Sequence, residues 1–373
     1  MITTEIINDT EAFRKLRIEW TELLNTSSTD CLFLTWEWMY TWWQCLSGKH
    51  SLHIILVRRN GLLIALAPLA LSPSRLLPSM PFRMLEFIAS GSVGSDYLGI
   101  IFRKRYEDDS LRAIETCLGE AGHAIEFVHV DKTSFPMVGM VLQLRQAGWK
   151  TRSMTTNYCP YASIANLDWE AYLNTLHRTH RADVVNNMTR LHKEFSVEFR
   201  TAGTEMERQQ AMDTFITLHS SRKPKHEGSI SFEKPEQVDF HKIFSRRALQ
   251  QGWLGMHTLC LDDIPVASLY TFHYHGVCYY YQAAFDREYA KYSVEMTAVA
   301  LCIKHAIQEK DQEFDFLHDN TEHKYLWCIN ERELIRLELF PPKSTGRIYQ
   351  KALVMTNGLK RLLGNIYTPL LGS

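Results

Sequence analysis

The sequence predicts a mixed α/β fold made of two similar halves, because one order of elements occurs twice along the chain. Each half has two strand-like runs joined by a tight turn, then a third strand, a helix and a short apolar strand. A repeated order of this kind indicates a structural duplication even where residues differ. The elements of the first and second halves cover, in matching pairs, 52–71 and 253–276, 84–100 and 277–293, 109–122 and 294–310, and 125–131 and 314–320.

The helices and turns of the first half follow from local residue patterns. Residues 10–24 carry apolar side chains at helical spacing, and Thr10 is a candidate N-cap. Residues 36–46, WEWMYTWWQCL, predict a second helix rich in aromatic residues. Asn60 and Gly61 separate two β-rich runs, and both residue types tolerate the positive φ of a tight hairpin turn. A hairpin is therefore expected here.

The duplication predicts two domains, an N-terminal one over 1–155 and a C-terminal one over 156–373. The second is expected to contain a helical insert over 168–245. Within it, residues 223–237 are rich in Lys, Gly, Pro and Ser and predict an exposed loop, either a linker or a functional lid. The amphipathic segment 345–371 is expected to pack against its own domain rather than against a membrane.

Charge and cysteine usage restrict the possible partners. The 41 Lys and Arg residues balance 42 Asp and Glu residues, and the net charge of −1 gives no reason to expect nucleic acid as a partner. The first residues lack the pattern of a secretory signal, and no apolar run is long enough to span a bilayer. The eight cysteines are scattered, without a Cys-x-x-Cys pair, which is typical of reduced thiols. We therefore expect a cytoplasmic protein without a transmembrane segment.

The stretch FDFLHDNTEHKYLW, residues 314–327, gathers acids and histidines at the end of a predicted strand. A metal needs three or four convergent ligands on a rigid frame, and the histidine spacing here does not supply them, so no metal is expected. General acid/base catalysis is the alternative to metal binding, since strand ends in α/β folds often open into a cleft. A polar turn without a chemical role is the other reading. The candidates are Asp315, His318, Asp319, Glu322 and His323.

Polar residues elsewhere are candidates for binding an anion or a substrate. The loop before the predicted helix at 294 could present helix N–H groups to a phosphate, with Lys291, Tyr292, Ser293, Val294 and Glu295 around it. Ser293 is the candidate N-cap. The corresponding loop of the first half contains Asp96 and Tyr97, a basic helix contains Arg181, and Tyr281 lies in an aromatic strand. Each of these also has a purely structural reading, as a capped helix, a bulge, a solvated face or a core residue.

Several segments in order resemble one protein group. They are FLTWEWMYTWWQCL, LIALAPLAL, SGSVGSDYLGI, LHRTHRADVVNNMTRL, FDREYAKYSVEM and FDFLHDNTEHKYLW. In this order the chain resembles acetyltransferase-like proteins of the cellulose-biosynthesis CelD/BcsL type, within the GNAT superfamily and related to FemX. The sequence contains no Gly-x-Ser-x-Gly, P-loop or Gly-x-Gly-x-x-Gly motif. The resemblance covers nearly the whole chain and implies a FemX-like pair of tandem GNAT-like domains, each a mixed sheet flanked by helices.

The resemblance implies an N-acyltransferase that moves an acyl group from acetyl-CoA, another acyl-CoA or a related thioester to an amine. An acyl carrier protein is a possible donor partner. Residues 291–295 would hold the cofactor, although Ser293-Val294-Glu295 lacks the glycine that the family often has. Asp315, Asp319, Glu322 and His323 are the candidate bases, and the substrate would be bound by Asp96, Tyr97, Arg181, Tyr281, His318 and Lys324.

Two alternatives remain from the sequence. One is a FemX-like transferase that takes its acyl group from aminoacyl-tRNA. The other is a degenerate GNAT protein that only binds, within a polysaccharide or natural-product pathway, and the missing glycine at 293–295 favours it.

Overall fold

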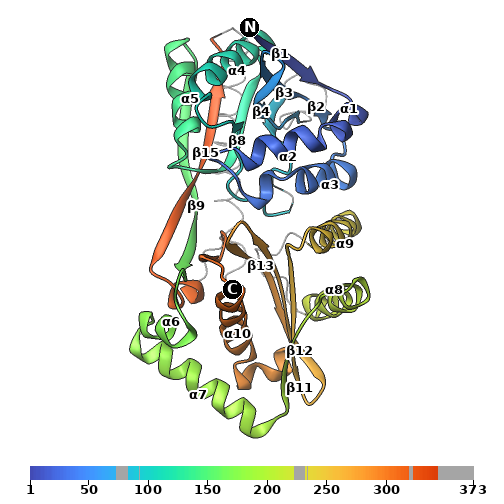
Figure 1. Ribbon diagram of the computed structural model, residues 1–373, viewed down its shortest axis with the longest axis vertical. Coiled ribbons are helices and arrows are strands. Elements are labelled where there is room, and N and C mark those ends of the chain that lie inside the picture. Colours follow the sequence, from blue (N-terminus) through green and yellow to red (C-terminus); the bar gives the residue numbers. More distant parts are fainter. Residues whose placement is uncertain (73–82, 92, 222–231, 233, 319–321, 343–373) are drawn as a thin grey trace, which may run out of the picture. The chain divides into compact units, whose positions relative to one another are not determined.

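The computed structural model describes the chain except residues 73–82, 92, 222–231, 233, 319–321 and 343–373 (Figure 1). Most of the loop predicted at 223–237, and the whole amphipathic segment predicted at 345–371, therefore lie outside the described residues. The chain forms two compact units. Of the described residues, the N-terminal unit contains those within 1–91, 97–156 and 334–342, and the C-terminal unit contains those within 93–96 and 157–333.

The N-terminal unit contains a four-stranded sheet and part of a larger one. The first sheet has the order β1 (Ile2–Ile7), β3 (Ile54–Arg59), β4 (Leu62–Ala67) and β7 (Ile101–Phe102). The N-terminal unit also contributes strands to the larger sheet, in the order β2 (Ser51–Leu52), β5 (Leu69–Leu71), β6 (Met84–Phe87), β8 (Ala124–Asp131) and β15 (Asn330–Phe340). Its α-helices in the described range are α1 (Thr10–Lys15), α2 (Arg17–Asn25), α3 (Trp36–Leu46), α4 (Glu107–Ala121) and α5 (Phe135–Gln146).

Local sequence signals position most of these elements correctly. Strands β3 and β4 form the predicted hairpin, and Asn60 and Gly61 have φ values of 49° and 85°. The prediction of Thr10 as N-cap is wrong, because the side chain of Asp9 accepts the hydrogen bond from the N–H of Ala12 at 2.8 Å. The single helix expected over residues 10–24 is divided into two helices, α1 and α2, which meet at Leu16.

The C-terminal unit contains six neighbouring strands, in the order β10, β11, β12, β13, β14 and β9. Helices α8 and α9 cover one face of this sheet, and α7 and α10 lie on the other (Figure 1). The region predicted as a helical insert also contains β10, which pairs with β11. The strands are β10 (Val197–Thr201), β11 (Leu254–Leu261), β12 (Ile264–Tyr274), β13 (Val277–Phe285), β14 (Glu313–Asp315) and β9 (Lys150–Ser163). The helices are α6 (Trp169–Thr175), α7 (Arg178–Glu194), α8 (Glu205–Ser220), α9 (Pro235–Gln250) and α10 (Val294–Gln308).

The sheet of the C-terminal unit is buried on both faces because its strands carry large apolar side chains in alternation. Tyr270 and Phe272 of β12 pack with aromatic residues of α8 and α9, including Phe215 and Phe244. Leu269 and its neighbours belong to the core that includes the buried side chains of α10. The sheet is therefore a rigid frame for any side chain at its ends.

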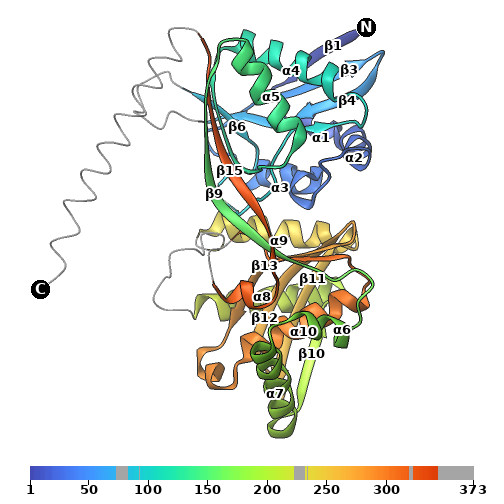
Figure 2. The same ribbon diagram turned by 90° about the vertical axis from the view of Figure 1, so that its left-hand side faces the viewer.

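Strands β9 and β15 each belong to both units. The first half of β9 lies in the N-terminal unit, and its last residues, Tyr161–Ser163, pair with β14 in the C-terminal unit. Strand β15 begins in the C-terminal unit, and its residues Leu334–Leu339 pair with β8 in the N-terminal unit. Figure 2 shows β9 and β15 as two long neighbouring strands, and within the N-terminal unit Thr156 Oγ1 donates to Leu334 O at 3.2 Å. Each unit is thus completed by a strand from a distant part of the chain.

Candidate functional site

The parallel strands β13 and β14 of the C-terminal unit are paired over only a short stretch. Val277–Tyr279 pair with Glu313–Asp315, and β13 then continues to Phe285, whereas β14 ends. After β14 the backbone bends at Leu317, which has a φ of 55°. The carboxyl ends of parallel strands are the usual place for ligands in α/β folds. The side chains around this bend are therefore the first candidates for a functional site.

A buried carboxylate and a histidine meet at the bend. Oδ1 of Asp96 lies 2.6 Å from Nδ1 of His318, and Oδ2 accepts the backbone N–H of His318 at 2.9 Å. The Asp96 side chain is fully buried, and the His318 side chain is 28% exposed. A carboxylate bound to Nδ1 fixes the tautomer and the orientation of the ring, so proton exchange with another group has to pass through Nε2. The sequence predicted both residues as substrate ligands, and the structure brings them together.

The segment that carries Asp96 is held by the sheet. The hydroxyl of Tyr281 on β13 donates to the carbonyl oxygen of Val93, and Sγ of Cys159 on β9 lies 3.8 Å from Oδ2 of Asp96. Residues 93–96 belong to the C-terminal unit, whereas Gly91 and Tyr97 belong to the N-terminal one. The predicted pocket residue Tyr281 therefore positions the loop that presents Asp96.

Asp315, a predicted catalytic base, is buried and engaged in the bend itself. Its Oδ1 accepts the N–H of Leu317 at 2.8 Å, and its Oδ2 lies 3.4 Å from the guanidinium of Arg332. Arg332 also forms two 2.6 Å hydrogen bonds to Glu313 and stacks 3.9 Å above the ring of Tyr161. These contacts stabilise the charged form of Asp315 and the shape of the turn.

The other predicted residues of this stretch occupy different environments. Glu322 and His323 are exposed on a short 3-10 helix, Glu322–Leu326, whereas Asp319 lies outside the described residues. Lys324 is partly buried, and its Nζ donates to Phe316 O at 2.7 Å, which ties the short helix to the bend.

Helices α6 and α7 hold the end of the stretch. The hydroxyl of Tyr172 donates to Trp327 O at 2.8 Å, and the ring of His180 meets the Trp327 ring edge-on at 4.6 Å. Burial and the nearby Asp315 raise the pKa of the Cys328 thiol to about 12. This cysteine therefore stays protonated at neutral pH and is a poor nucleophile.

The predicted cofactor loop lies at the start of α10. Residues Arg287–Tyr292 form a 3-10 helix, and Ser293 occupies the N-cap position of α10 with a φ of 53°. The expected capping role of the Ser293 side chain is not found, because that side chain makes no cap hydrogen bond. The left-handed backbone at Ser293 is the conformation that glycine adopts most readily. Val294 is buried, and Glu295 is exposed in the first turn.

Positive charge gathers beside this junction. The ammonium group of the exposed Lys291 lies 4.8 Å from the centre of the Tyr292 ring. Arg190 on α7 donates to the carbonyl oxygen of Lys291 at 3.3 Å, so a second cation comes from a different helix. The predicted ligand Arg181, also on α7, donates instead to Asn174 at 2.6 Å. Arg190, rather than Arg181, is the arginine of α7 that contacts the loop.

Sequence reasoning missed several residues of the site for a simple reason. Cys159 and Arg332 were not among the candidates, because they acquire their places only through contacts over long distances in the chain. Arg190 belongs to a basic stretch, residues 177–193, which predicted contact with an anionic substrate or a cofactor phosphate, but the sequence alone could not distinguish Arg190 from its basic neighbours. Tyr97 belongs to the N-terminal unit, where its carbonyl oxygen lies 3.7 Å from Sγ of Cys31.

Comparison with known proteins agrees with this architecture. Residues 178–325 match the family model described as an acetyltransferase (GNAT) domain, a range that includes β13, α10 and β14. A search against curated protein sequences gave no match. No described helix is both long enough and apolar enough to cross a membrane.

Three solved structures share the fold across almost the whole chain. A crystal structure of FemX has 12% identity, covers 93% of this chain and 99% of its own, and gives a TM-score of 0.63. A protein of unknown function from Bacteroides thetaiotaomicron has 10% identity, coverages of 91% and 99% and a TM-score of 0.55. The C-terminal domain of a putative lysylphosphatidylglycerol synthetase from Agrobacterium fabrum has 10% identity, coverages of 93% and 96% and a TM-score of 0.52. The predicted mixed α/β fold is confirmed by its similarity to FemX, and the match to the GNAT domain model lies within residues 178–325.

Proposed function

We propose that this chain is an N-acyltransferase that transfers an acyl group from acyl-CoA or a related thioester to an amine, at the C-terminal unit. The observation that carries the proposal is that β14 ends at Asp315, opposite Tyr279, whereas β13 continues to Phe285. Where a strand continues past the end of its parallel neighbour, its backbone can hydrogen-bond to the amides of an extended ligand. Helix α10 follows β13 from the same end of the sheet.

The start of α10 supports binding of the donor phosphates. Its first N–H groups carry the positive end of a 15-residue helix, and such ends attract anions. Lys291 and Arg190 add two cationic side chains to the same place. Glu295 opposes an anion, but it is exposed, so its charge is screened by solvent. A pyrophosphate at this junction would direct the rest of the donor along β13.

The pair of His318 and Asp96 supports the proton transfer that the reaction requires. An amine must lose a proton when its nitrogen attacks the thioester carbonyl, and Nε2 of His318 would accept that proton. Asp96 would stabilise the resulting imidazolium through its 2.6 Å contact with Nδ1. The thiolate leaves as the tetrahedral intermediate collapses, and a strand N–H of β13 is the expected donor to its oxyanion.

The other predicted bases receive different roles in this proposal. Asp315 shapes the bend and Lys324 secures it, so both are positioning residues. Glu322 and His323 are exposed beside the bend and would contact the acceptor rather than the thioester. The resemblance to CelD/BcsL-type proteins supports a place in a biosynthetic pathway.

A donor screen tests the proposal. The purified chain is incubated with a set of amines and with acetyl-CoA, longer acyl-CoAs, an acylated carrier protein or aminoacyl-tRNA, and products are identified by mass spectrometry. We expect an acylated amine and free CoA from one of the CoA donors. Product formation only with aminoacyl-tRNA, abolished by ribonuclease, would identify the FemX-like alternative. Neither turnover nor calorimetric binding with any donor would identify a binding protein and overturn the proposal.

A further inference from the structure

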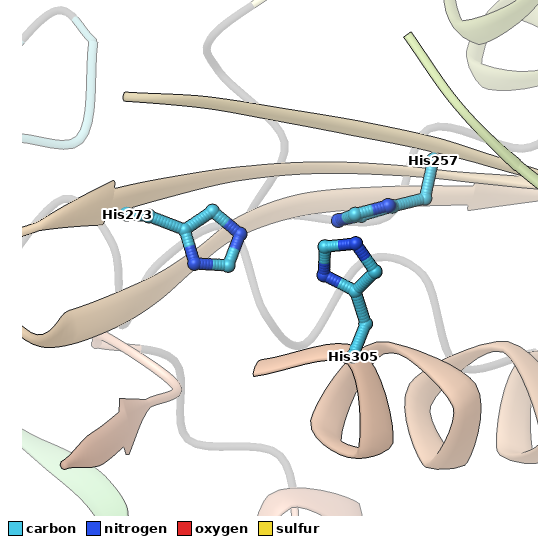
Figure 3. A group of neighbouring side chains, drawn as sticks. All are labelled: His257, His273 and His305. Atoms are coloured by element: carbon cyan, nitrogen blue, oxygen red, sulfur yellow. The ribbon is translucent and has the colours of Figure 1, made fainter. Parts of the chain in front are cut away.

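Three histidines meet on the face of the C-terminal sheet that α10 covers (Figure 3). His257 comes from β11, His273 from β12 and His305 from the last turn of α10. One ring nitrogen of each lies within 4.8 Å of those of the other two. The ring of His257 is fully buried, and the His273 side chain is only 17% exposed. These residues lie outside the site described above.

The hydrogen bonds of these rings leave nitrogen atoms directed at one another. Nδ1 of His273 lies 2.6 Å from Oδ2 of the buried Asp311. Among the described residues, Nε2 of His273 and Nδ1 of His305 are buried and have no hydrogen-bond partner. His257 is bound at Nδ1 by Thr201 at 2.9 Å, and its Nε2 has only a 3.3 Å contact with Thr271. Unsatisfied buried nitrogens are costly and call for an explanation.

Asp311 is held in place by the end of α10. The N–H of Asp311 donates to Ala306 O at 3.0 Å and that of Lys310 to Ile307 O at 3.1 Å, while Lys310 has a φ of 64°. This is the Schellman arrangement that closes many helices. It fixes the carboxylate beneath the His273 ring, in the place that carboxylates take behind metal-binding histidines.

Gly255 provides the room that the His273 ring occupies. A Cβ atom at this position would lie 2.8 Å from Nε2 of His273 and 2.2 Å from Oγ1 of Thr271. Only glycine therefore lets the strand β11 approach the imidazole so closely. The backbone is adapted to hold Nε2 of His273 in the interior, next to the other two rings.

We propose that His257, His273 and His305 bind a divalent transition-metal ion of the zinc class. Three imidazole nitrogens are a frequent ligand set for zinc, and Zn–N bonds of 2.0–2.1 Å place ligand nitrogens about 3.3 Å apart in a tetrahedral site. Since the ring nitrogens lie within 4.8 Å of one another, they must approach by up to about 1.5 Å on binding. The ion would join two strands to the last turn of α10.

Electrostatics favours a cation in this position. The carbonyl end of a helix attracts positive charge, and His305 lies in the last turn of α10. The buried carboxylate of Asp311, 2.6 Å from Nδ1 of His273, adds negative charge behind that ring.

This site is separate from the proposed acyl-transfer site. His305 lies about 16 Å along the helix axis from the first residue of α10, where the donor phosphates are proposed to bind. The metal proposal therefore does not depend on the acyltransferase proposal, and it can be tested without any substrate.

Metal titration of the full chain tests the proposal. The protein is treated with a chelator, dialysed and titrated with Zn²⁺ by calorimetry and with Co²⁺ by visible absorption, which reports tetrahedral nitrogen ligands. We expect one tight equivalent for the wild type and a higher Tm with Zn²⁺, because an ion that binds only the folded state stabilises it. His305→Ala should lose this equivalent, and Asp311→Asn should weaken it about 10–100-fold.

His275→Ala is the matched control, because this histidine is exposed in the turn after β12. It should bind Zn²⁺ as the wild type does. Circular dichroism checks that each variant is folded. If His305→Ala does not fold, Asp311→Asn still tests the site, because this substitution hardly changes the side-chain volume. Absence of stoichiometric binding by the wild type, or equal binding by all four proteins, would overturn the proposal. Thiolate bands in the Co²⁺ spectrum would likewise assign the ion to cysteines and overturn it.

Discussion

Nδ1 of His318 lies 2.6 Å from Oδ1 of Asp96, although 222 residues separate the two along the chain. The contact joins the bend after β14 to a short segment, Val93–Asp96, that is held by Tyr281 of β13. A buried carboxylate behind a partly exposed imidazole is the arrangement of a general base whose ring is fixed in orientation. The strongest consequences of the proposed function therefore concern these two residues.

Removing either partner should slow acyl transfer more than it weakens binding. We expect His318→Ala and Asp96→Asn each to lower kcat by about 10²–10⁴-fold, the usual contribution of a positioned base, with a smaller change in KM. Steady-state kinetics on the amine found in the donor screen measure both constants. His275→Ala, exposed and in another turn, is the control for a lost imidazole. Full turnover by a folded His318→Ala variant would remove His318 as the base.

The donor-phosphate site gives a second kinetic prediction. Lys291→Ala and Arg190→Ala should each raise KM for the CoA donor about two- to fivefold, with kcat almost unchanged, because a charge at or near the surface contributes about 0.5–1 kcal/mol. The effect should shrink at high salt as the charges are screened. Lys242→Ala removes the same charge from α9, on the opposite face of the sheet. An equal rise in KM for Lys242→Ala would show that net charge, and not this junction, is responsible.

The sequence predicted the fold better than the site. Hairpins and helices depend on local signals such as Asn60-Gly61, and the hairpin is found where it was expected, whereas the helix expected over 10–24 is divided at Leu16. The sharing of β9 and β15 between the units has no local signal, because it depends on which distant strand completes each sheet. Asp96 and His318 were both candidates, but only the folded chain brings them together. The three histidines of β11, β12 and α10 were not recognised, since their spacing in the sequence follows no metal motif.

Acid stability offers a prediction that is independent of function. Glu205 at the start of α8 binds the buried guanidinium of Arg208 through hydrogen bonds of 2.7 and 2.8 Å. The hydrogen bond from Arg208 lowers the pKa of Glu205 from 4.5 to about 2 despite opposing burial. A lowered folded-state pKa stabilises the protein above the unfolded pKa, and this stabilisation is lost as pH falls from about 4.5 to about 2.

Glu205→Gln should therefore destabilise the C-terminal unit at neutral pH and make its stability less sensitive to acid. We expect the free energy of unfolding to fall by about 1–2 kcal/mol, mainly because the buried charge of Arg208 loses its carboxylate partner. The loss is not larger because Glu205 is itself partly exposed to solvent. Urea unfolding at pH 7 and pH 3 measures the difference. Glu198→Gln, which breaks a pair with the half-exposed Arg200, should change stability little. Equal losses in the two variants would contradict the assignment to buried charge.

The end of α10 gives a prediction in which a substitution stabilises the protein. Lys310 follows the C-cap of α10 with a φ of 64°, a conformation that costs a side-chain-bearing residue about 1 kcal/mol more than glycine. Lys310→Gly should therefore raise the free energy of unfolding by about 0.5–1 kcal/mol, after the entropy that glycine adds to the unfolded chain. Glu309→Gly is the matched control, because Glu309 has a right-handed φ of −72° and gains no relief. Thermal unfolding should give a higher Tm for Lys310→Gly and a lower one for Glu309→Gly, and the same direction in both would show that strain at Lys310 is not the cause.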